Sequence, residues 1–301
     1  MIPTDKITEI FCSIDDFCLV FEPAFHKKLI SSGKKRRNRK STMSMSEILT
    51  ITILFHISGI RCFKHFYISY VQQHLKSEFP RTVSYNRFVE LMESNVLPLT
   101  LYLKTCCLGE CSGISFVDST PIRACKNKRI SRNKVFKNIA TIGKSTMGWF
   151  YGFKLHIIVN DKGEILNFVV TQANVDDRTP LKSGNFLKKA FGSLYADKGY
   201  ISKDLFQMLF EDGLHLVTGI RNKMKNSLMT MRDKILLRKR SVIETINDQL
   251  KNIGQVEHSR HRSFANFITN LVAGLIAYSF QNKKPSIKFE TEKSNQLALF
   301  F

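Results

Sequence analysis

Apolar residues recur at helical spacing through most of the first hundred positions. Segments with this period lie at 5–21, 44–58, 63–75 and 84–103. The pattern is typical of amphipathic helices in a bundle, and Ser84 fits the N-cap of the last one. Tyr85, Asn86 and Arg87 resemble the start of the second helix of a compact DNA-binding unit, although ordinary bundles show the same pattern. We expect residues 1–108 to form a helical DNA-binding domain.

The hydrophobic period changes near residue 110. Three runs rich in β-branched and aromatic residues follow: GISFVDS at 113–119, YGFKLHIIVN at 151–160 and EILNFVVTQ at 164–172. Such runs, when bounded by turn residues, predict β-strands. Asp161-Lys162-Gly163 separates the last two runs and is a hairpin signal, so these two strands should pair antiparallel.

Beyond these runs the pattern alternates between helical and strand periods. We predict a helix at 176–191, a strand at SLYADKGY (193–200), a helix at 202–211, a strand at LHLVTG (214–219) and a helix at 238–254. Three initial strands followed by alternating helices and strands predict an α/β fold. Its mixed sheet, flanked by helices, has the order of the ribonuclease-H-like fold. We assign this fold to residues 109–258, and residues 259–301 to a C-terminal helix and flexible tail.

The predicted helix at 238–254 carries an unusual polar face. Its apolar stripe comprises Val242, Ile246, Leu250 and Ile253. Arg240, Glu244 and Lys251 fall within an arc of about 40° on another face. A carboxylate between two cations can bind a metal ion beside a phosphate, but ordinary surface ion pairs give the same pattern.

The composition favours a polyanionic partner. The 301 residues include 46 Lys and Arg against 25 Asp and Glu, a formal net charge of +21, and nucleic acid is the leading candidate. Seven cysteines without a CxxC pair argue against a disulfide framework or zinc knuckle and indicate a reducing, cytosolic setting. The sequence shows no signal peptide, and we expect 264–280 to be a buried helix rather than a membrane span.

Basic residues gather in blocks that we expect to contact DNA phosphates. One block, in a predicted flexible loop at 33–41, includes Lys34, Lys35, Arg36 and Arg37. No acidic residue occurs from 119 to 160, and this stretch includes Lys126, Lys128, Arg129 and Arg132. Lys198, next to Asp197, joins the set. Phosphate contacts of this kind position DNA and make binding steeply dependent on salt. Charge that serves only solubility is the alternative.

Two aspartates follow strands that should be parallel neighbours. Asp118 ends the first predicted strand and Asp197 ends the fourth, so the ends that carry them should lie side by side. Either residue alone could be a turn former. With Glu244 they would form a cluster of carboxylates that suits Mg²⁺ or Mn²⁺. Two such ions about 3.5–4 Å apart can drive phosphodiester displacement.

The chain resembles the DDE transposases of bacterial insertion sequences, most closely the insertion-sequence 982 family, related to the insertion-sequence 4 superfamily. The motifs that carry the resemblance are FVDSTPI, WFYGFKLH, NVDDRTPL, YADKGY and RSVIETINDQLK. It implies a catalytic triad of Asp118, Asp197 and Glu244, with Arg240 and Lys251 holding the terminal phosphates of the transposon end. Leu237 stands where the insertion-sequence 4 signature has a Tyr, so a Tyr contact to an extruded base is not implied.

The resemblance also implies a reaction, partners and a location. A transposase would bind the terminal inverted repeats of its element, cut the 3′ ends and join them to target DNA, using Mg²⁺ or Mn²⁺. Bringing two ends together would need a homodimer or larger synaptic complex, in the bacterial cytoplasm at the nucleoid. A DNA-binding regulator or domesticated remnant without cleavage, or a ribonuclease-H-like endonuclease without strand transfer, are the alternatives.

Three smaller features are open to two interpretations each. Lys154 and His156 share one face of their strand and are predicted DNA contacts beside the active site, although a core His is equally typical. Asp176 or Asp177 should cap the following helix rather than bind metal. Trp149 can stack on bases, but core packing is the favoured role.

Overall fold

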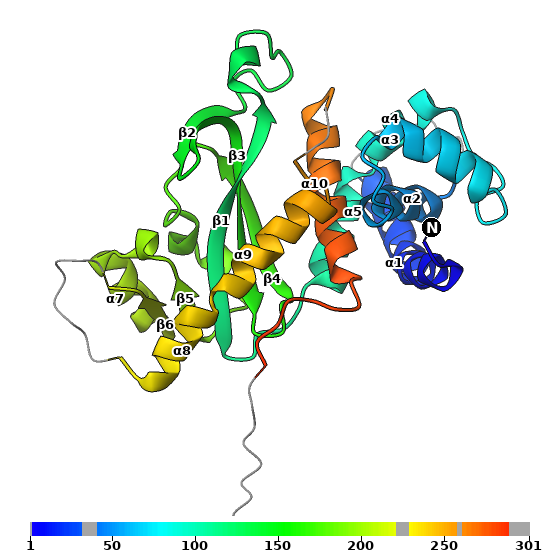
Figure 1. The fold of residues 1–301 in the computed structure, drawn as a ribbon. Helices are drawn as coiled ribbons and strands as arrows, with labels where there is room; N and C mark the ends of the chain where they lie inside the picture. The colour runs from blue at the N-terminus through cyan, green and yellow to red at the C-terminus, as the bar shows by residue number, and fades with distance from the viewer. Residues whose placement is uncertain (1, 32–40, 221–228, 258–260, 289–301) are drawn as a thin grey trace, which may run out of the picture.

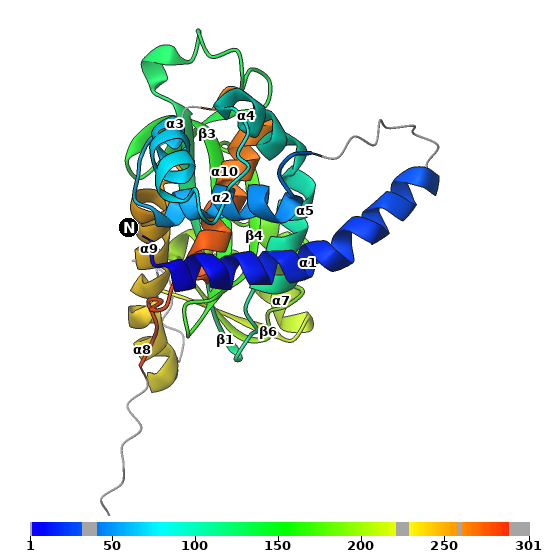
Figure 2. The same ribbon diagram turned by 90° about the vertical axis from the view of Figure 1, so that its right-hand side faces the viewer.

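The N-terminal third of the chain is a bundle of helices (Figure 1). The computed structural model describes residues 2–31, 41–220, 229–257 and 261–288. The first region comprises α1 (Thr4–Ser31), α2 (Met45–Ile57), α3 (Phe63–His65), the π-helix η1 (Phe66–His74), α4 (Tyr85–Ser94), α5 (Val96–Tyr102) and the π-helix η2 (Leu103–Cys107). Figure 2 shows α1 running beside α2 and extending past the rest of this region.

Short polar residues begin the helices of this region. The Ser44 hydroxyl accepts a hydrogen bond from the Glu47 amide at 3.1 Å, and the Ser44 amide donates to the Glu47 carboxylate at 2.7 Å, which makes a capping box. Ser84 is the N-cap of α4, as predicted. The predicted helix at 84–103 is interrupted at Asn95, which separates α4 from α5. Its amide side chain turns back to the Leu91 carbonyl instead.

A six-stranded mixed sheet forms the second region. Its strands are β1 (Ile114–Cys125), β2 (Thr141–Ser145), β3 (Gly148–Asn160), β4 (Ile165–Gln172), β5 (Gly192–Ala196) and β6 (Leu214–Thr218). The order is β2-β3-β1-β5-β6, and β4 also pairs with β3. Strand β3 is antiparallel to both β1 and β4, whereas β5 is parallel to β1 and β6 is parallel to β5. The predicted ribonuclease-H-like fold is confirmed, with β2 as an additional strand.

The predicted hairpin joins β3 and β4. Asn160 closes it, because its side-chain oxygen accepts hydrogen bonds from the Lys162 and Glu164 amides. Gly163 adopts φ +78°, and a Cβ there would lie 2.0 Å from the Pro285 carbonyl oxygen. Both the turn conformation and the close approach of the C-terminal segment therefore require glycine.

The predicted helix at 176–191 is wrong. The segment contains a 3₁₀ turn, η4 (Pro180–Lys182), and a four-residue helix, α6 (Gly184–Leu187). Pro180 and Gly184 lie inside the predicted span and break the helical period. Asp176 caps no helix, because its carboxylate binds the Arg178 amide at 2.9 Å and the guanidinium at 2.7 Å.

The chain between β1 and the C-terminus is completed by short helices. They are η3 (Asn127–Arg129), η5 (Lys198–Tyr200), α7 (Lys203–Glu211), α8 (Met231–Lys239), α9 (Ser241–Asp248), the π-helix η6 (Gln249–Ile253) and α10 (Phe264–Ser279). The helix predicted at 238–254 is therefore α9 with a π-helical extension. The wider π turn, closed by a hydrogen bond from the Gly254 amide to the Gln249 carbonyl, leaves Ile253 exposed rather than in the apolar stripe.

The sheet and the N-terminal helices share one hydrophobic core. Helix α10 lies between them in Figure 1 and packs against α2, α4 and α5. One core cluster includes residues of these helices and of one sheet face, such as Phe116 and Ile157. A second cluster on the opposite face includes Val117 and residues of α6 and α7. None of the helices in the described residues is long and apolar enough to cross a membrane.

Candidate active site

Asp118 and Asp197 occupy matching positions on neighbouring parallel strands. The β1–β5 register ends with Phe116 opposite Tyr195, and both aspartates lie two residues further along. Side chains alternate along a strand, so the aspartates project from the same face as these rings, whose centroids are 5.5 Å apart. Asp197 keeps an extended backbone as the N-cap of η5. The predicted neighbouring positions on parallel strands are confirmed, although β1 does not end at Asp118 and continues to Cys125.

Glu244 approaches this face from α9, which crosses β1 in Figure 1. Val242, Ile243 and Ile246 are buried and fix the helix against the sheet. The side-chain amide of Asn247 donates a hydrogen bond to the Asp118 carboxylate at 3.0 Å. This bond ties the helix that carries Glu244 directly to the strand that carries Asp118.

The pKa of Asp118 reflects its burial and the charges around it. Burial is the largest cause, and together with the negative charges of Glu244 and Asp197 it raises the pKa to about 6. The Arg240 guanidinium and the Ser119 backbone amide act in the opposite direction. The carboxylates are thus close enough to interact, and removal of Asp118 from water is the main reason for its raised pKa.

Arg240 engages Glu244 rather than solvent. Its Nη2 lies 2.6 Å from Glu244 Oε1, and the arginine side chain is 17% exposed whereas the glutamate is 55% exposed. One turn of helix separates the two residues, as the sequence spacing predicted. Because Arg240 also lowers the pKa of Asp118, it acts on the carboxylate cluster and is more than a surface partner of Glu244.

Lys251 lies beside the cluster in a second ion pair. Its Nζ is 3.7 Å from the Glu257 carboxylate, which is also 3.9 Å from Arg123 of β1. Burial lowers the pKa of Lys251, whereas the charges of Glu257 and Asp118 raise it. The π turn η6 thus leaves Lys251 within the electrostatic field of Asp118.

The carboxylates have the chemistry of a Mg²⁺ or Mn²⁺ site, since they offer hard oxygen ligands. Within the described residues, no three His, Cys, Asp or Glu side chains lie close enough to hold a metal ion in this conformation. Asn247 Oδ1, in the side chain that binds Asp118, has no hydrogen-bond partner among these residues. Burial and the charge of Asp118 raise the pKa of the Tyr200 hydroxyl. An unpartnered oxygen beside a carboxylate of raised pKa fits a cation or its bound water.

The opposite face of β3 holds Lys154 and His156. The two side chains do share a face, but it faces away from Asp118, whose β3 partner is Ile157. His156 is 1% exposed and bonds Thr171 Oγ1 at 2.8 Å. Lys154 is 13% exposed and pairs with Asp177 at 2.9 Å. His156 therefore has no surface from which to contact DNA here, and the interpretation as a core histidine holds. Lys154 is engaged within the protein.

The other predicted DNA contacts lie on the surface where they are described. The segment between β1 and β2, which contains η3, exposes Lys126, Lys128, Arg129 and Arg132. Lys198 is exposed at the start of η5. Lys34, Lys35, Arg36 and Arg37 lie outside the described residues.

Sequence reasoning missed two residues and misplaced a third. Asn247 follows Glu244 by three positions, so helical spacing could have identified it. Tyr200 stands in the same YADKGY motif as Asp197, but nothing in the sequence predicts its burial. Trp149 is 63% exposed, so the favoured core-packing role is wrong. It lies in a two-stranded extension of the sheet that the sequence pattern did not predict.

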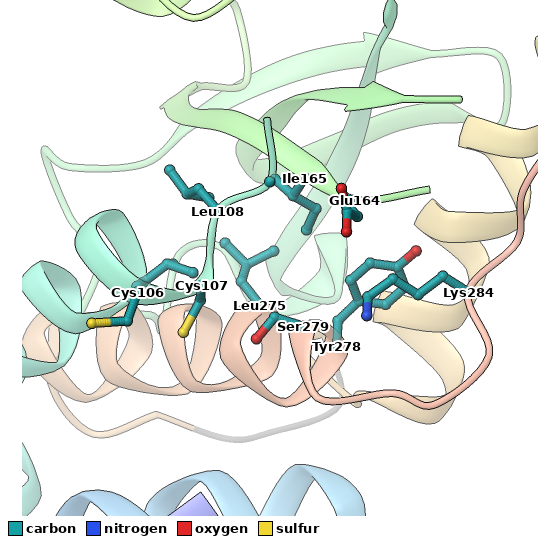
Figure 3. A pocket seen from close by; sticks show the side chains of 11 residues that line it. Cys106, Cys107, Leu108, Glu164, Ile165, Leu275, Tyr278, Ser279 and Lys284 are labelled. Carbon is teal, nitrogen blue, oxygen red and sulfur yellow. The ribbon is translucent and has the colours of Figure 1, made fainter. Parts of the chain in front are cut away.

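A cavity of about 190 Å³ lies away from these carboxylates (Figure 3). It opens between η2, the start of β4 and α10, and Cys107, Glu164, Tyr278 and Lys284 are among its lining residues. Burial raises the pKa of the Cys107 thiol to about 12, so this cysteine is not an activated nucleophile. The cavity offers no counterpart of the carboxylate cluster.

Comparisons with known proteins bear on the sheet region. A family described as "Transposase DDE domain" matches residues 108–264, just over half of the chain. No curated protein matches the sequence. Among solved structures, the chain is similar to a piggyBac transposase, determined by cryo-EM as a synaptic complex with hairpin DNA. That similarity has 10% sequence identity and a TM-score of 0.47, and it covers 92% of this chain and 72% of the other.

Proposed function

The chain belongs to the transposase DDE domain family, and we propose that it is a DNA transposase that cleaves and joins the ends of its own insertion sequence. Its DNA partners would be the terminal inverted repeats and the target. The observation that carries the proposal is the convergence of Asp118, Asp197 and Glu244 on one face of the sheet. The pKa of Asp118, raised chiefly by burial, supports a catalytic rather than a structural role for this cluster.

Asp118, Asp197 and Glu244 would hold Mg²⁺ or Mn²⁺, with two ions as the proposed number. When bound, these ions activate a water or 3′-hydroxyl nucleophile and stabilise the leaving oxygen of the phosphodiester. For Glu244 to contribute, its carboxylate must turn from Arg240 toward Asp118. The pair is exposed on the glutamate side, so this rearrangement needs no change in the core.

Arg240 and Lys251 are the proposed contacts to the phosphates at the transposon end. Each is now paired with a carboxylate: Arg240 with Glu244 of the cluster, and Lys251 with Glu257 beside the cluster. A phosphate group would replace the carboxylate as the partner of Arg240, and Glu244 would then be released. Guanidinium groups bind phosphate oxygens in the same bidentate geometry as carboxylates.

The exposed cations between β1 and β2 extend the proposed DNA surface away from the cluster. Asn127–Arg129 form η3, and the segment around it carries no acidic residue. Contacts between such side chains and the DNA backbone would hold the substrate without reading its sequence. Recognition of the inverted repeats is assigned to the helical region 1–108, as is typical of a separate DNA-binding unit.

The proposal is tested with purified protein and labelled inverted-repeat ends taken from the DNA that flanks the gene. Wild-type protein with Mg²⁺ or Mn²⁺ should cut the 3′ ends and join them to a plasmid target. Asp118→Ala should do neither. Asp212→Asn is the matched control, because it removes an exposed carboxylate that contacts none of these groups.

Each remaining outcome has a clear meaning. Equal cleavage by wild type and Asp118→Ala would contradict the proposed mechanism. Cleavage without joining would identify an endonuclease that lacks strand transfer. Binding of ends with no cleavage under either metal would instead favour a regulator or domesticated remnant.

A further inference from the structure

The β2–β3 hairpin presents a large apolar surface to solvent. Trp149 is 63% exposed, Met147 in the turn is 82% exposed and Ile142 is 52% exposed. Trp149 is the only tryptophan in the chain. Single exposed apolar residues need no explanation, but three on one short hairpin are typical of a binding surface.

The hairpin holds the Trp149 backbone in place while its ring remains exposed. The next residue, Phe150, is 1% exposed and anchors β3 in the interior. Asn127 of η3 donates a side-chain hydrogen bond to the Trp149 carbonyl at 2.9 Å. Lys144 lies directly opposite Trp149 in the β2–β3 register, with its Nζ 5.8 Å from the ring centroid. An aromatic ring on an ordered backbone needs little further ordering when it binds a partner.

The charge around the hairpin identifies the kind of partner. Every charged residue that is exposed near the hairpin in sequence is basic. These residues are Lys126, Lys128, Arg129, Arg132, Lys134, Lys137 and Lys144. A second copy of this chain would bring the same cations to the surface, and like charges would repel. A polyanion that also offers flat aromatic faces satisfies both the cations and the ring. Nucleic acid has this combination, because its bases stack on aromatic side chains.

We propose that the β2–β3 hairpin is a nucleobase-binding element, in which Trp149 stacks on a base of bound DNA where the duplex is opened or kinked. The inference deepens the proposed function by assigning a base contact outside the carboxylate cluster. Trp149 lies eight residues along β3 from Ile157, the partner of Asp118. Eight residues of strand span at most roughly 27 Å. With the lengths of the side chains added, we expect the contacted base within roughly one helical turn of DNA from the scissile phosphate.

The single tryptophan makes the contact directly observable. Fluorescence of the Asp118→Ala protein, without divalent metal, is recorded during titration with single-stranded dT30 and, in parallel, with heparin. Stacking on thymine should quench Trp149, whereas heparin, a polyanion without bases, should bind and leave the emission nearly unchanged. Equal quenching by both ligands, or dT30 binding without quenching, would overturn the proposal. In the latter case the proposed DNA-binding function would still stand, whereas failure to bind any DNA would contradict both.

Substitutions test the energy of the contact through the anisotropy of labelled dT30. Trp149→Ala should weaken binding roughly 5- to 150-fold, the range expected for loss of one stacked base, and Trp149→Phe should recover most of it. Phe210→Ala is the matched control, because Phe210 is an exposed aromatic residue (66%) on α7. Unchanged affinity of Trp149→Ala would contradict the proposal.

Two other occupants would give distinct signals. A blue shift of the emission on raising protein concentration without DNA would identify a contact between two copies of the chain. A blue shift with phosphatidylserine vesicles, larger than any change with dT30, would identify a lipid surface. Either result would replace the nucleobase assignment.

Discussion

The two faces of the β1–β3 strand pair differ in how their polar side chains are paired. On the face toward α9, Asp118 is half-buried near two other carboxylates, and its pKa rises to about 6, chiefly through burial. On the opposite face, Lys154 is matched by Asp177 at 2.9 Å, and His156 is bonded to Thr171 at 2.8 Å. Both faces carry polar side chains at adjacent strand positions. On the first face the pKa of a carboxyl group is raised, whereas on the second each of these side chains has a close partner.

This difference separates a site from a structural network. Neutralising Lys154 within the protein stabilises the fold and leaves little for a ligand to do. A carboxylate removed from water near other carboxylates costs stability, and a cation can remove that cost. The side-chain alternation that placed Lys154 and His156 together also placed them on the wrong face for catalysis.

Replacing one carboxylate on each face should give the largest difference between the two faces. Glu244→Gln should lower end cleavage at least about 1000-fold, equivalent to about 4 kcal/mol of transition-state stabilisation, because it removes a proposed metal ligand. Asp177→Asn should leave cleavage within a few-fold of wild type. It should lower the free energy of unfolding by about 1–2 kcal/mol, because Lys154 loses its partner. Cleavage rates and urea unfolding measure the two effects, and the reverse assignment would refute the comparison.

The raised pKa of Asp118 should appear as a pH-dependent stability. The Asp118 pKa is higher in the folded protein (about 6) than its ordinary value of 3.8, so ionisation opposes folding and stability falls as pH rises between these values. Without divalent metal, Asp118→Asn should therefore be more stable than wild type at pH 7, by up to about 3 kcal/mol. The difference should vanish below pH 4.

The opposite face should show the opposite trend. Burial lowers the pKa of His156 to about 4, so its protonation opposes folding as pH falls below 6.5.

Urea unfolding of wild type and Asp118→Asn at several pH values, in EDTA, measures the contribution of Asp118. Equal stability of the two proteins at pH 7 would show that the ionised Asp118 carboxylate does not destabilise the folded protein.

Asn247→Leu tests whether Asn247 orients the Asp118 carboxylate or only packs in the core. The change removes the 3.0 Å hydrogen bond to Asp118 and also removes the unpartnered Oδ1. Cleavage should fall by about 10–100-fold, the range for a residue that orients a metal ligand, while the melting temperature stays within a few degrees of wild type. A loss of stability with unchanged cleavage would make Asn247 a packing residue.

The smallest effects are expected when Lys251, beside the carboxylate cluster, and Lys154, on the opposite face, are replaced. Lys251→Met should weaken binding of inverted-repeat ends a few-fold and reduce the slope of log affinity against log salt by about one, as for one lost phosphate contact. Lys154→Met should leave the slope unchanged, because Lys154 lies on the sheet face opposite Asp118 and its ion pair with Asp177 (2.9 Å) is closer than that of Lys251 with Glu257 (3.7 Å). Anisotropy titrations at several salt concentrations measure both slopes. An equal change in both variants would remove the distinction between these lysines.

The sequence predicted the elements that its own local pattern determines. The strand runs, the β3–β4 hairpin and the Ser84 cap were found because alternation, turn residues and N-caps act within a few residues. The neighbouring positions of Asp118 and Asp197 followed from strand order. The family resemblance supplied Arg240 and Lys251 as phosphate contacts, and these roles remain proposals.

The errors arose where distant contacts decide the outcome. The helix predicted at 176–191 does not form, because Pro180 and Gly184 interrupt the helical spacing of its apolar positions. Burial of His156 and exposure of Trp149 depend on which sheet face is covered and on the extra strand β2, which the local pattern does not reveal. The core shared through α10 joins residues far apart in the chain, so the boundary predicted near 108 does not coincide with a gap between cores.

Direct binding of Mn²⁺ tests the central claim that Asp118, Asp197 and Glu244 form one metal site. Electron paramagnetic resonance measures free Mn²⁺ during titration of wild type and of Asp118→Asn, Asp197→Asn, Glu244→Gln and the control Asp177→Asn, each bound to inverted-repeat DNA. Each of the first three variants should bind Mn²⁺ at least about tenfold more weakly than wild type, and Asp177→Asn should match wild type. Undiminished Mn²⁺ binding by all three site variants would contradict the account.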